Sequence, residues 1–277
     1  MVWLVMAFET TICLPKEELK VDYGGAELII RPATSEFYAD VSVEFESGRN
    51  DLKYRKLLRR FLNALSWSYR EPIYERLETG DTTHRPRVKK NHIDHCFGHL
   101  DTECIPDVGE DEDKALALSL YRSALNARSC PAAVVDLMRI FEIKLGRDSK
   151  IIRNWINENI SELRSTYWEN LPPHDLEAKR RLDELLRKMP DIDVGDHLYY
   201  TARCASAHAE LDPNDPHNPE HNERLAEDLC IIWYLVEMYI EKELGVPSPY
   251  RERPILPSLY DCMKLSGLLN GADLSSD

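Results

Sequence analysis

The chain has 277 residues, 43% hydrophobic and 30% charged, which is enough for one large domain or two ordinary ones with packed cores. Its formal net charge of −14 argues against broad nucleic-acid binding, and its apolar runs are too short for a membrane span, so no membrane partner is expected. Seven cysteines, an odd number without a regular framework, favour a cytoplasmic location over secretion.

The N-terminal part predicts β-strands. Residues 1–8 are apolar, with no basic residues before them and no small-residue cleavage site after them, which indicates a buried first strand and not a signal peptide. Residues 26–30 follow a Gly24-Gly25 turn, and residues 38–45 alternate apolar and polar side chains, as a half-buried strand does. Leucines at helical spacing then predict a helix over 52–70.

Positive charge is concentrated between residues 53 and 90, which hold eleven Lys or Arg against four Asp or Glu. Aromatic residues lie among these cations. The favoured interpretation is a solvated helix face whose aromatics point into the core. The alternative is a surface that binds phosphates and stacks bases, with Arg59, Arg60, Lys89 and Lys90 as the substrate-binding candidates.

A second cluster of polar residues follows this stretch. His92, His95, Cys96 and His99 are side-chain types that bind Zn²⁺, which makes a metal-binding accessory protein one hypothesis. Their spacing contains neither a Cys-x2-Cys pair nor His-Glu-x2-His, so the favoured interpretation is a loop with scattered polar groups. We therefore expect no metal and no cofactor.

The sequence changes character at residue 112 and predicts helices from there on. Expected helices cover 113–128, 131–145, 149–163, a charged stretch ending at 189, 193–209 and 219–244, with prolines or glycines at most of the breaks. The predicted fold class is α+β, with a small β-rich N-terminal domain followed by an all-α antiparallel bundle. The predicted domains are 1–111 and 112–247, followed by a tail over 248–277.

The most informative motif is Arg203, four residues and then His208. It lies at the end of the helix expected over 193–209, before a Pro-, Asp- and Asn-rich stretch and the last long helix. A bundle whose penultimate helix ends in Arg, four to six residues and His resembles the HEPN superfamily. The resemblance covers roughly 112–245 and includes the preceding helix pair over 115–146. The β-rich start followed by such a bundle also resembles the MauJ-type proteins of methylamine utilisation.

The HEPN resemblance implies a metal-independent endoribonuclease that works as a dimer, in a stress or phage-defence setting. Arg203 and His208 are the residues that match the family motif. The histidine would serve as general base or acid for attack of a ribose 2′-hydroxyl, and the arginine would stabilise charge on the phosphoryl oxygens. The expected products are a 2′,3′-cyclic phosphate and a 5′-hydroxyl.

Two features favour a catalytically silent protein- or ligand-binding module of the MauJ type as the alternative. Catalytic members often have a polar residue after the arginine, whereas this chain has Cys204. An i, i+5 pair on a regular helix also points about 140° apart, so the two side chains converge only if the helix distorts or a partner subunit completes the site. A homodimer is expected in either case, because the helix around Trp233, Tyr234 and Tyr239 is apolar almost all round.

Overall fold

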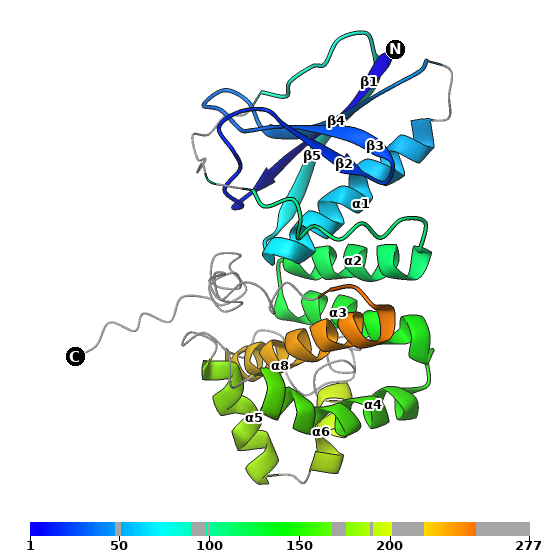
Figure 1. Ribbon diagram of the computed structural model, residues 1–277. Coiled ribbons are helices and arrows are strands. Elements are labelled where there is room, and N and C mark those ends of the chain that lie inside the picture. Colours follow the sequence, from blue (N-terminus) through cyan, green and yellow to red (C-terminus); the bar gives the residue numbers. More distant parts are fainter. Residues whose placement is uncertain are drawn as a thin grey trace, which may run out of the picture. The chain divides into compact units, whose positions relative to one another are not determined.

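The computed structural model describes residues 1–47, 51–89, 98, 100–167, 176–188, 191–200 and 219–247. The chain divides into two compact units, residues 1–122 and 123–277 (Figure 1). The division falls within helix α2 (Glu112–Leu125), and the predicted domain boundary lies at the start of that helix. Strands in the first unit followed by helices confirm the predicted α+β class. The predicted tail over 248–277 lies outside the described residues.

The first unit is built on a five-stranded antiparallel sheet with the strand order β2-β3-β4-β1-β5. The strands are β1 (Val2–Thr10), β2 (Leu19–Tyr23), β3 (Ala26–Arg31), β4 (Ala39–Phe45) and β5 (Ile73–Thr82). The three predicted strands are confirmed as β1, β3 and β4. The edge strand β2 falls within the N-terminal part that was expected to form strands, without bounds of its own. The other edge strand, β5, was not predicted, because its charged residues Glu75, Arg76 and Glu78 interrupt the alternation of apolar and polar side chains.

Helix α1 (Asp51–Tyr69) covers one face of this sheet and confirms the predicted helix. Leu28, Val43 and Leu4 are opposed across β3, β4 and β1, and at most 1% of each is exposed. On the same face, the Tyr23 ring meets the Phe61 ring of α1 edge to face, with centroids 5.3 Å apart. The core of this unit therefore lies between the sheet and α1, where aromatic contacts add to the area buried.

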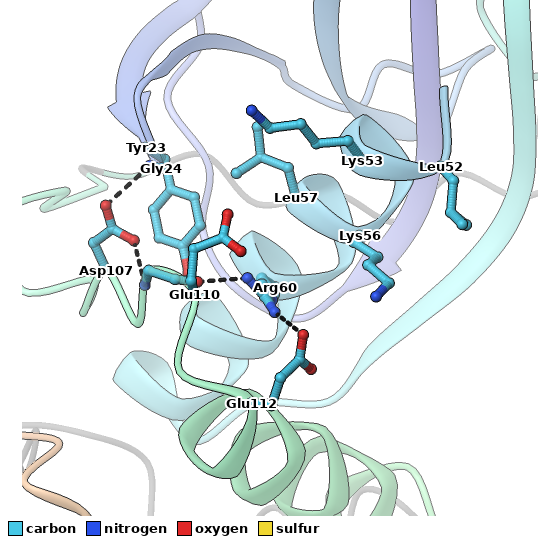
Figure 2. Close-up of a pocket in the computed structure, with 11 residues that line it drawn as sticks. Tyr23, Gly24, Leu52, Lys53, Lys56, Leu57, Arg60, Asp107, Glu110 and Glu112 are labelled. Atoms are coloured by element: carbon cyan, nitrogen blue, oxygen red, sulfur yellow. Dashed lines mark hydrogen bonds and ion pairs between the residues drawn. The ribbon is translucent and has the colours of Figure 1, made fainter. Parts of the chain in front are cut away.

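The turn between β2 and β3 is tied to the chain that precedes α2. Gly24 adopts φ = 57°, a conformation that favours glycine, and a Cβ there would lie 2.4 Å from Leu57 Cδ1. The Gly24 amide donates to Asp107 Oδ2 at 2.9 Å, and the Gly109 amide donates to Asp107 Oδ1, also at 2.9 Å (Figure 2). A single carboxylate thus joins the turn to the segment that leads into α2.

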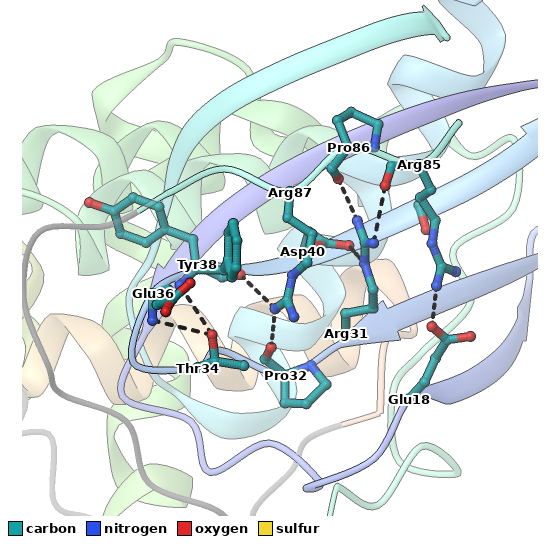
Figure 3. A network of polar contacts seen from close by, with 12 residues as sticks. Glu18, Arg31, Pro32, Thr34, Glu36, Tyr38, Asp40, Arg85, Pro86 and Arg87 are labelled. Carbon is teal, nitrogen blue, oxygen red and sulfur yellow. Dashed lines mark hydrogen bonds and ion pairs between the residues drawn. The ribbon is translucent and has the colours of Figure 1, made fainter. Parts of the chain in front are cut away.

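The opposite side of the sheet holds a buried acid that is surrounded by arginines (Figure 3). Arg31 Nε donates to Asp40 Oδ1 at 2.7 Å, and the Arg31 guanidinium also donates to the carbonyls of Arg85 and Pro86. Arg87 donates to the Pro32 carbonyl at 2.6 Å. These contacts fix the segment after β5 against β3 and β4. Burial raises the pKa of Asp40 and outweighs the opposing effect of Arg31.

The second unit is helical. Its elements include α3 (Cys130–Leu145), α4 (Ser149–Glu162), a π-helical turn (Leu163–Tyr167), α5 (Leu176–Lys188), α6 (Asp191–His197) and α8 (Pro219–Leu244). Gly146 ends α3, and the Asp148 side chain caps α4 by accepting from the Lys150 amide. The helix expected over 193–209 is α-helical only as far as His197. Residues 198–200 are π-helical, and the remainder lies outside the described residues.

Aromatic side chains connect three helices of this unit. Phe141 of α3, Trp155 of α4 and Tyr239 of α8 have ring centroids 5.0–5.4 Å apart in each pairing. The Tyr239 hydroxyl donates to the Phe141 carbonyl and accepts from the Lys144 amide, each at 3.2 Å. It therefore ties α8 to the backbone of the last turns of α3.

The apolar circumference of α8 is already covered within the single chain. Trp233, Tyr234 and Tyr239 are at most 1% exposed, as are the neighbouring Ile232 and Val236. The expectation that these aromatics form a dimer surface therefore loses its physical basis, because a buried side chain cannot contact a second copy. A homodimer stays a prediction without that support.

No helix among the described residues combines the length and the low charge that a membrane span requires.

Candidate functional site

Arg203 and His208, the predicted catalytic pair, lie outside the described residues, as does Cys204. The structure does describe the chain on both sides of them: α6 and the π-helical residues 198–200 precede the segment 201–218, and α8 follows it. π-helical turns often occur at functional positions. The contacts that hold the two flanking helices therefore fix the described ends of the chain on either side of the motif.

A buried carboxylate joins the helices that flank this segment. Asp228 of α8 accepts from Arg181 of α5 through Nε and Nη2, at 3.0 and 2.9 Å, both on its Oδ1. Its other oxygen lies 3.0 Å from Nε2 of His197, the last residue of α6. The side chain of Asp228 is 5% exposed, and that of Arg181 is 9% exposed. We call Arg181, His197 and Asp228 the three-helix clamp.

The three-helix clamp is suited to holding helices together. Besides Asp228, Arg181 faces Glu227 at 3.3 Å and Glu184 at 3.7 Å, so its guanidinium is surrounded by carboxylates of its own chain. A carboxylate beside an imidazole fixes the orientation of the ring, as in catalytic sites. Here the carboxylate is also occupied by the arginine, and the burial of Arg181 and Asp228 favours a positioning role for the chain that enters residue 201.

A close approach of α4 and α6 adds to this positioning. Gly195 lies so near α4 that a Cβ would come within 2.4 Å of the Arg153 carbonyl oxygen. The Gly195 amide donates to Asn157 Oδ1 at 2.7 Å. Arg153 also pairs with Asp196 and lies over the ring of Tyr200, 5.1 Å from its centroid. The last described residues before the predicted motif are therefore held by α4 as well as by α8.

The predicted RNA-binding arginines of the first unit are engaged by acids of their own chain. Arg59 of α1 lies 3.3 Å from Glu75 and 3.0 Å from Glu78, both on β5. Arg55 pairs with Glu78 as well. The positive face of α1 is thus matched by an acidic face of β5, and this explains why the charged residues 73–82 form a strand.

The other predicted substrate-binding residues have separate surroundings. Arg60 donates to the Gly109 carbonyl and lies 2.8 Å from Glu112. Lys89 is exposed and forms an isolated antiparallel bridge with Phe37. Lys90 lies outside the described residues, so the structure does not bring the four candidates together as one described surface.

The predicted metal-ligand candidates His92, His95, Cys96 and His99 also lie outside the described residues. Within the ranges that are described, no group of three or more His, Cys, Asp or Glu side chains is arranged to hold a metal ion. Cys104, Cys130 and Cys230 form no disulfide, whereas Cys13 is disulfide-bonded. A disulfide is unusual in a reducing compartment, and the cytoplasmic location stays a prediction.

Sequence reasoning missed the three-helix clamp. Arg181 lies in a stretch of many charged residues and does not stand out. His197 lies in the helix expected over 193–209, where attention fell on the Arg203 and His208 motif. Asp228 lies among the apolar positions of α8. One signal was available. An aspartate at helical spacing from apolar residues such as Leu225 and Ile232 must have a partner, because an unpaired buried charge is costly.

Residues 117–241 match the model of the family described as methylamine utilization protein MauJ. The match runs from α2 to α8 and includes the three-helix clamp and the positions of Arg203 and His208. It covers somewhat less than half of the chain and supports a MauJ-like protein. The HEPN assignment stays a prediction. No match was found among curated proteins or among solved structures.

Proposed function

We propose that the chain is a MauJ-type accessory protein whose helical unit is a HEPN-like binding module. The observation that carries this proposal is the family match over 117–241, since it spans the helices on both sides of the predicted motif. The three-helix clamp is consistent with it, because three ionisable groups in the described part of the bundle are used to join helices.

The charge distribution also favours binding over RNA processing. Arg55, Arg59 and Arg60 are neutralised by acids of the same unit, which leaves less positive charge for phosphate contacts. The net charge of −14 also repels the negatively charged RNA at long range.

Complementation tests this function. In a host that grows on methylamine, this gene replaces the host's own MauJ-family gene. We expect growth on methylamine to be restored by the wild type and equally by the double variant Arg203→Ala/His208→Ala. Failure of both to restore growth, with the protein present at normal levels, would contradict the accessory role.

A second candidate function is a metal-independent endoribonuclease that uses Arg203 and His208. The specific observation in its favour is that α6 and α8, the helices on either side of the motif, are joined through His197 and Asp228. Catalytic groups need a rigid support of this kind. Arg59, Arg60, Lys89 and Lys90 would contact the RNA, and a second copy of the chain would complete the site.

Cleavage of a labelled RNA in excess EDTA tests the second candidate. A ribonuclease would leave 2′,3′-cyclic phosphate ends, and both Arg203→Ala and His208→Ala would abolish the cut. Charge reversal at Arg59, Arg60, Lys89 and Lys90 would weaken RNA binding. If the wild type does not cut the RNA even when the RNA saturates the protein, the ribonuclease is ruled out and the accessory role remains.

A further inference from the structure

A pocket of about 570 Å³ opens in the first unit between α1 and the segment that leads into α2 (Figure 2). One wall comes from α1 and includes Lys53, Lys56 and Leu57. The other wall comes from the segment around Gly109 and Glu110. All of the lining residues belong to the same compact unit, so its own fold forms the pocket.

Hydrogen bonds hold the two walls apart at a fixed distance. Arg60, at the base of the α1 wall, donates to the Gly109 carbonyl and pairs with Glu112 across the pocket (Figure 2). Asp107 is occupied by the amides of Gly24 and Gly109. These charged groups are therefore engaged in shaping the pocket, and they are not available to a ligand.

Two cations on the rim are not engaged in this way. Lys53 and Lys56 are exposed, and within the part of the chain that the structure describes neither ammonium has an ion-pair partner. They are three residues apart on α1 and so lie on the same side of the helix. Beside them, Leu52 is 52% exposed and lines the same pocket, so it adds apolar surface next to the two ammonium groups.

The hydroxyl of Tyr23 adds a polar group to the pocket lining. Tyr23 is only 3% exposed, and among the described residues no group makes a well-formed hydrogen bond with its hydroxyl, although the Val108 backbone lies nearby. Burial, followed by the nearby Asp107 carboxylate, raises the pKa of Tyr23, so the hydroxyl stays protonated and remains a donor. A buried donor without a partner is uncommon in folded proteins and marks a position where a ligand or water is needed.

We propose that this pocket binds a small organic molecule with one anionic group, a phosphate or a carboxylate, on an apolar skeleton. The ammonium groups of Lys53 and Lys56 bind the anionic group, and Leu52 and Leu57 contact the skeleton. Glu110 on the opposite wall limits the ligand to a single anionic end, because a polyanion such as nucleic acid would bring negative charge against it. This site is separate from the helical unit and from its proposed function.

Ligand-observed NMR on the full-length protein tests this site with four probes: phenyl phosphate, benzoate, inorganic phosphate and a short RNA. We expect phenyl phosphate or benzoate to bind with a dissociation constant of about 1 mM or lower, and inorganic phosphate to bind more weakly. The double variant Lys53→Gln/Lys56→Gln should weaken binding of the organic anion about fivefold or more. Leu52→Ser should weaken binding of the organic anion and leave inorganic phosphate unchanged.

Lys20→Gln is the matched control, because Lys20 is an exposed lysine of the same unit that pairs with Glu27 away from the pocket. It should bind like the wild type. The proposal is overturned if the double variant and the wild type bind the organic anions equally, or if no organic anion binds up to about 10 mM. It is also overturned if inorganic phosphate or the RNA binds more tightly than the organic anions with the same dependence on Lys53 and Lys56.

Discussion

His197 and Asp228 lie 31 positions apart in the chain, and their side chains meet at 3.0 Å inside the helical unit. Because Asp228 also accepts two hydrogen bonds from Arg181, this one carboxylate connects α5 and α6 to α8. The contact lies next to the segment that carries the predicted motif, so the stability of the bundle and the position of that segment depend on the same side chain.

Asp228→Ala should destabilise the protein strongly, because it removes the carboxylate that accepts two hydrogen bonds from the buried Arg181 guanidinium. Breaking a buried ion pair from one side costs about 3–5 kcal/mol. Urea unfolding followed by circular dichroism measures the change. Glu162→Ala, at a side chain that is 45% exposed and pairs with Lys242 away from the clamp, is the control and should cost less than about 1 kcal/mol. Equal effects of the two substitutions would show that the clamp is not the main contact.

The Arg31–Asp40 pair of the sheet should behave in the same way. Asp40→Asn should cost about 3 kcal/mol in the free energy of unfolding, since Arg31 is only 12% exposed and loses its charge partner. The double variant Arg31→Met/Asp40→Leu should recover much of that loss. Lys20→Ala serves as the control, because the exposed Lys20–Glu27 pair should contribute less than about 1 kcal/mol. A double variant no more stable than Asp40→Asn would contradict this expectation.

Glu237 should make stability fall as the pH rises. The side chain is fully buried on α8, and burial, together with Glu241, raises its pKa well above the usual range. The folded state therefore keeps a proton that the unfolded state releases above about pH 4.3. Its contribution is full below that pH and is lost as the pH rises toward the folded pKa.

Unfolding by urea between about pH 5 and about pH 8 checks the effect of Glu237. Relative to wild type, Glu237→Gln should gain stability as the pH rises, with a slope of up to about 1.4 kcal/mol per pH unit. Glu158→Gln, at an exposed position of α4, is the control and should follow the wild-type curve. Parallel curves for Glu237→Gln and the wild type would mean that the carboxyl is already ionised in the folded protein.

Cys130 should resist alkylation in the folded protein. Burial raises the pKa of its thiol to about 11, and the thiolate is the reactive form. At about pH 8, iodoacetamide should therefore label the partly exposed Cys104 first, and Cys130 only after unfolding. Peptide mapping by mass spectrometry measures both sites in the same sample. Comparable labelling rates in the folded state would show that the start of α3 opens readily.

Periodicity predicted the central strands and most of the helices, because β1, β3, β4 and α1 bury apolar residues at regular spacing. It failed at β5, whose order depends on Glu75 and Glu78 meeting arginines of α1. It also failed at the end of α6, because a π-helical turn has no simple apolar signature. The pocket combines Tyr23, Lys53 and Glu110, which are far apart in the sequence. Local sequence patterns do not indicate which distant residues lie close together in the fold, so the pocket could not be predicted.

The non-covalent contact between His197 and Asp228 also closes a loop of the chain in the sequence sense. Arg203 and His208 lie between these two residues. The conformational entropy of closing such a loop grows only with the logarithm of its length, by about 0.6 kcal/mol for each doubling. The closure cost of the contact between His197 and Asp228 should therefore change little with the number of residues between them. Chain length between α6 and α8 is thus a weak determinant of the stability of the bundle, whereas the Asp228 carboxylate is a strong one.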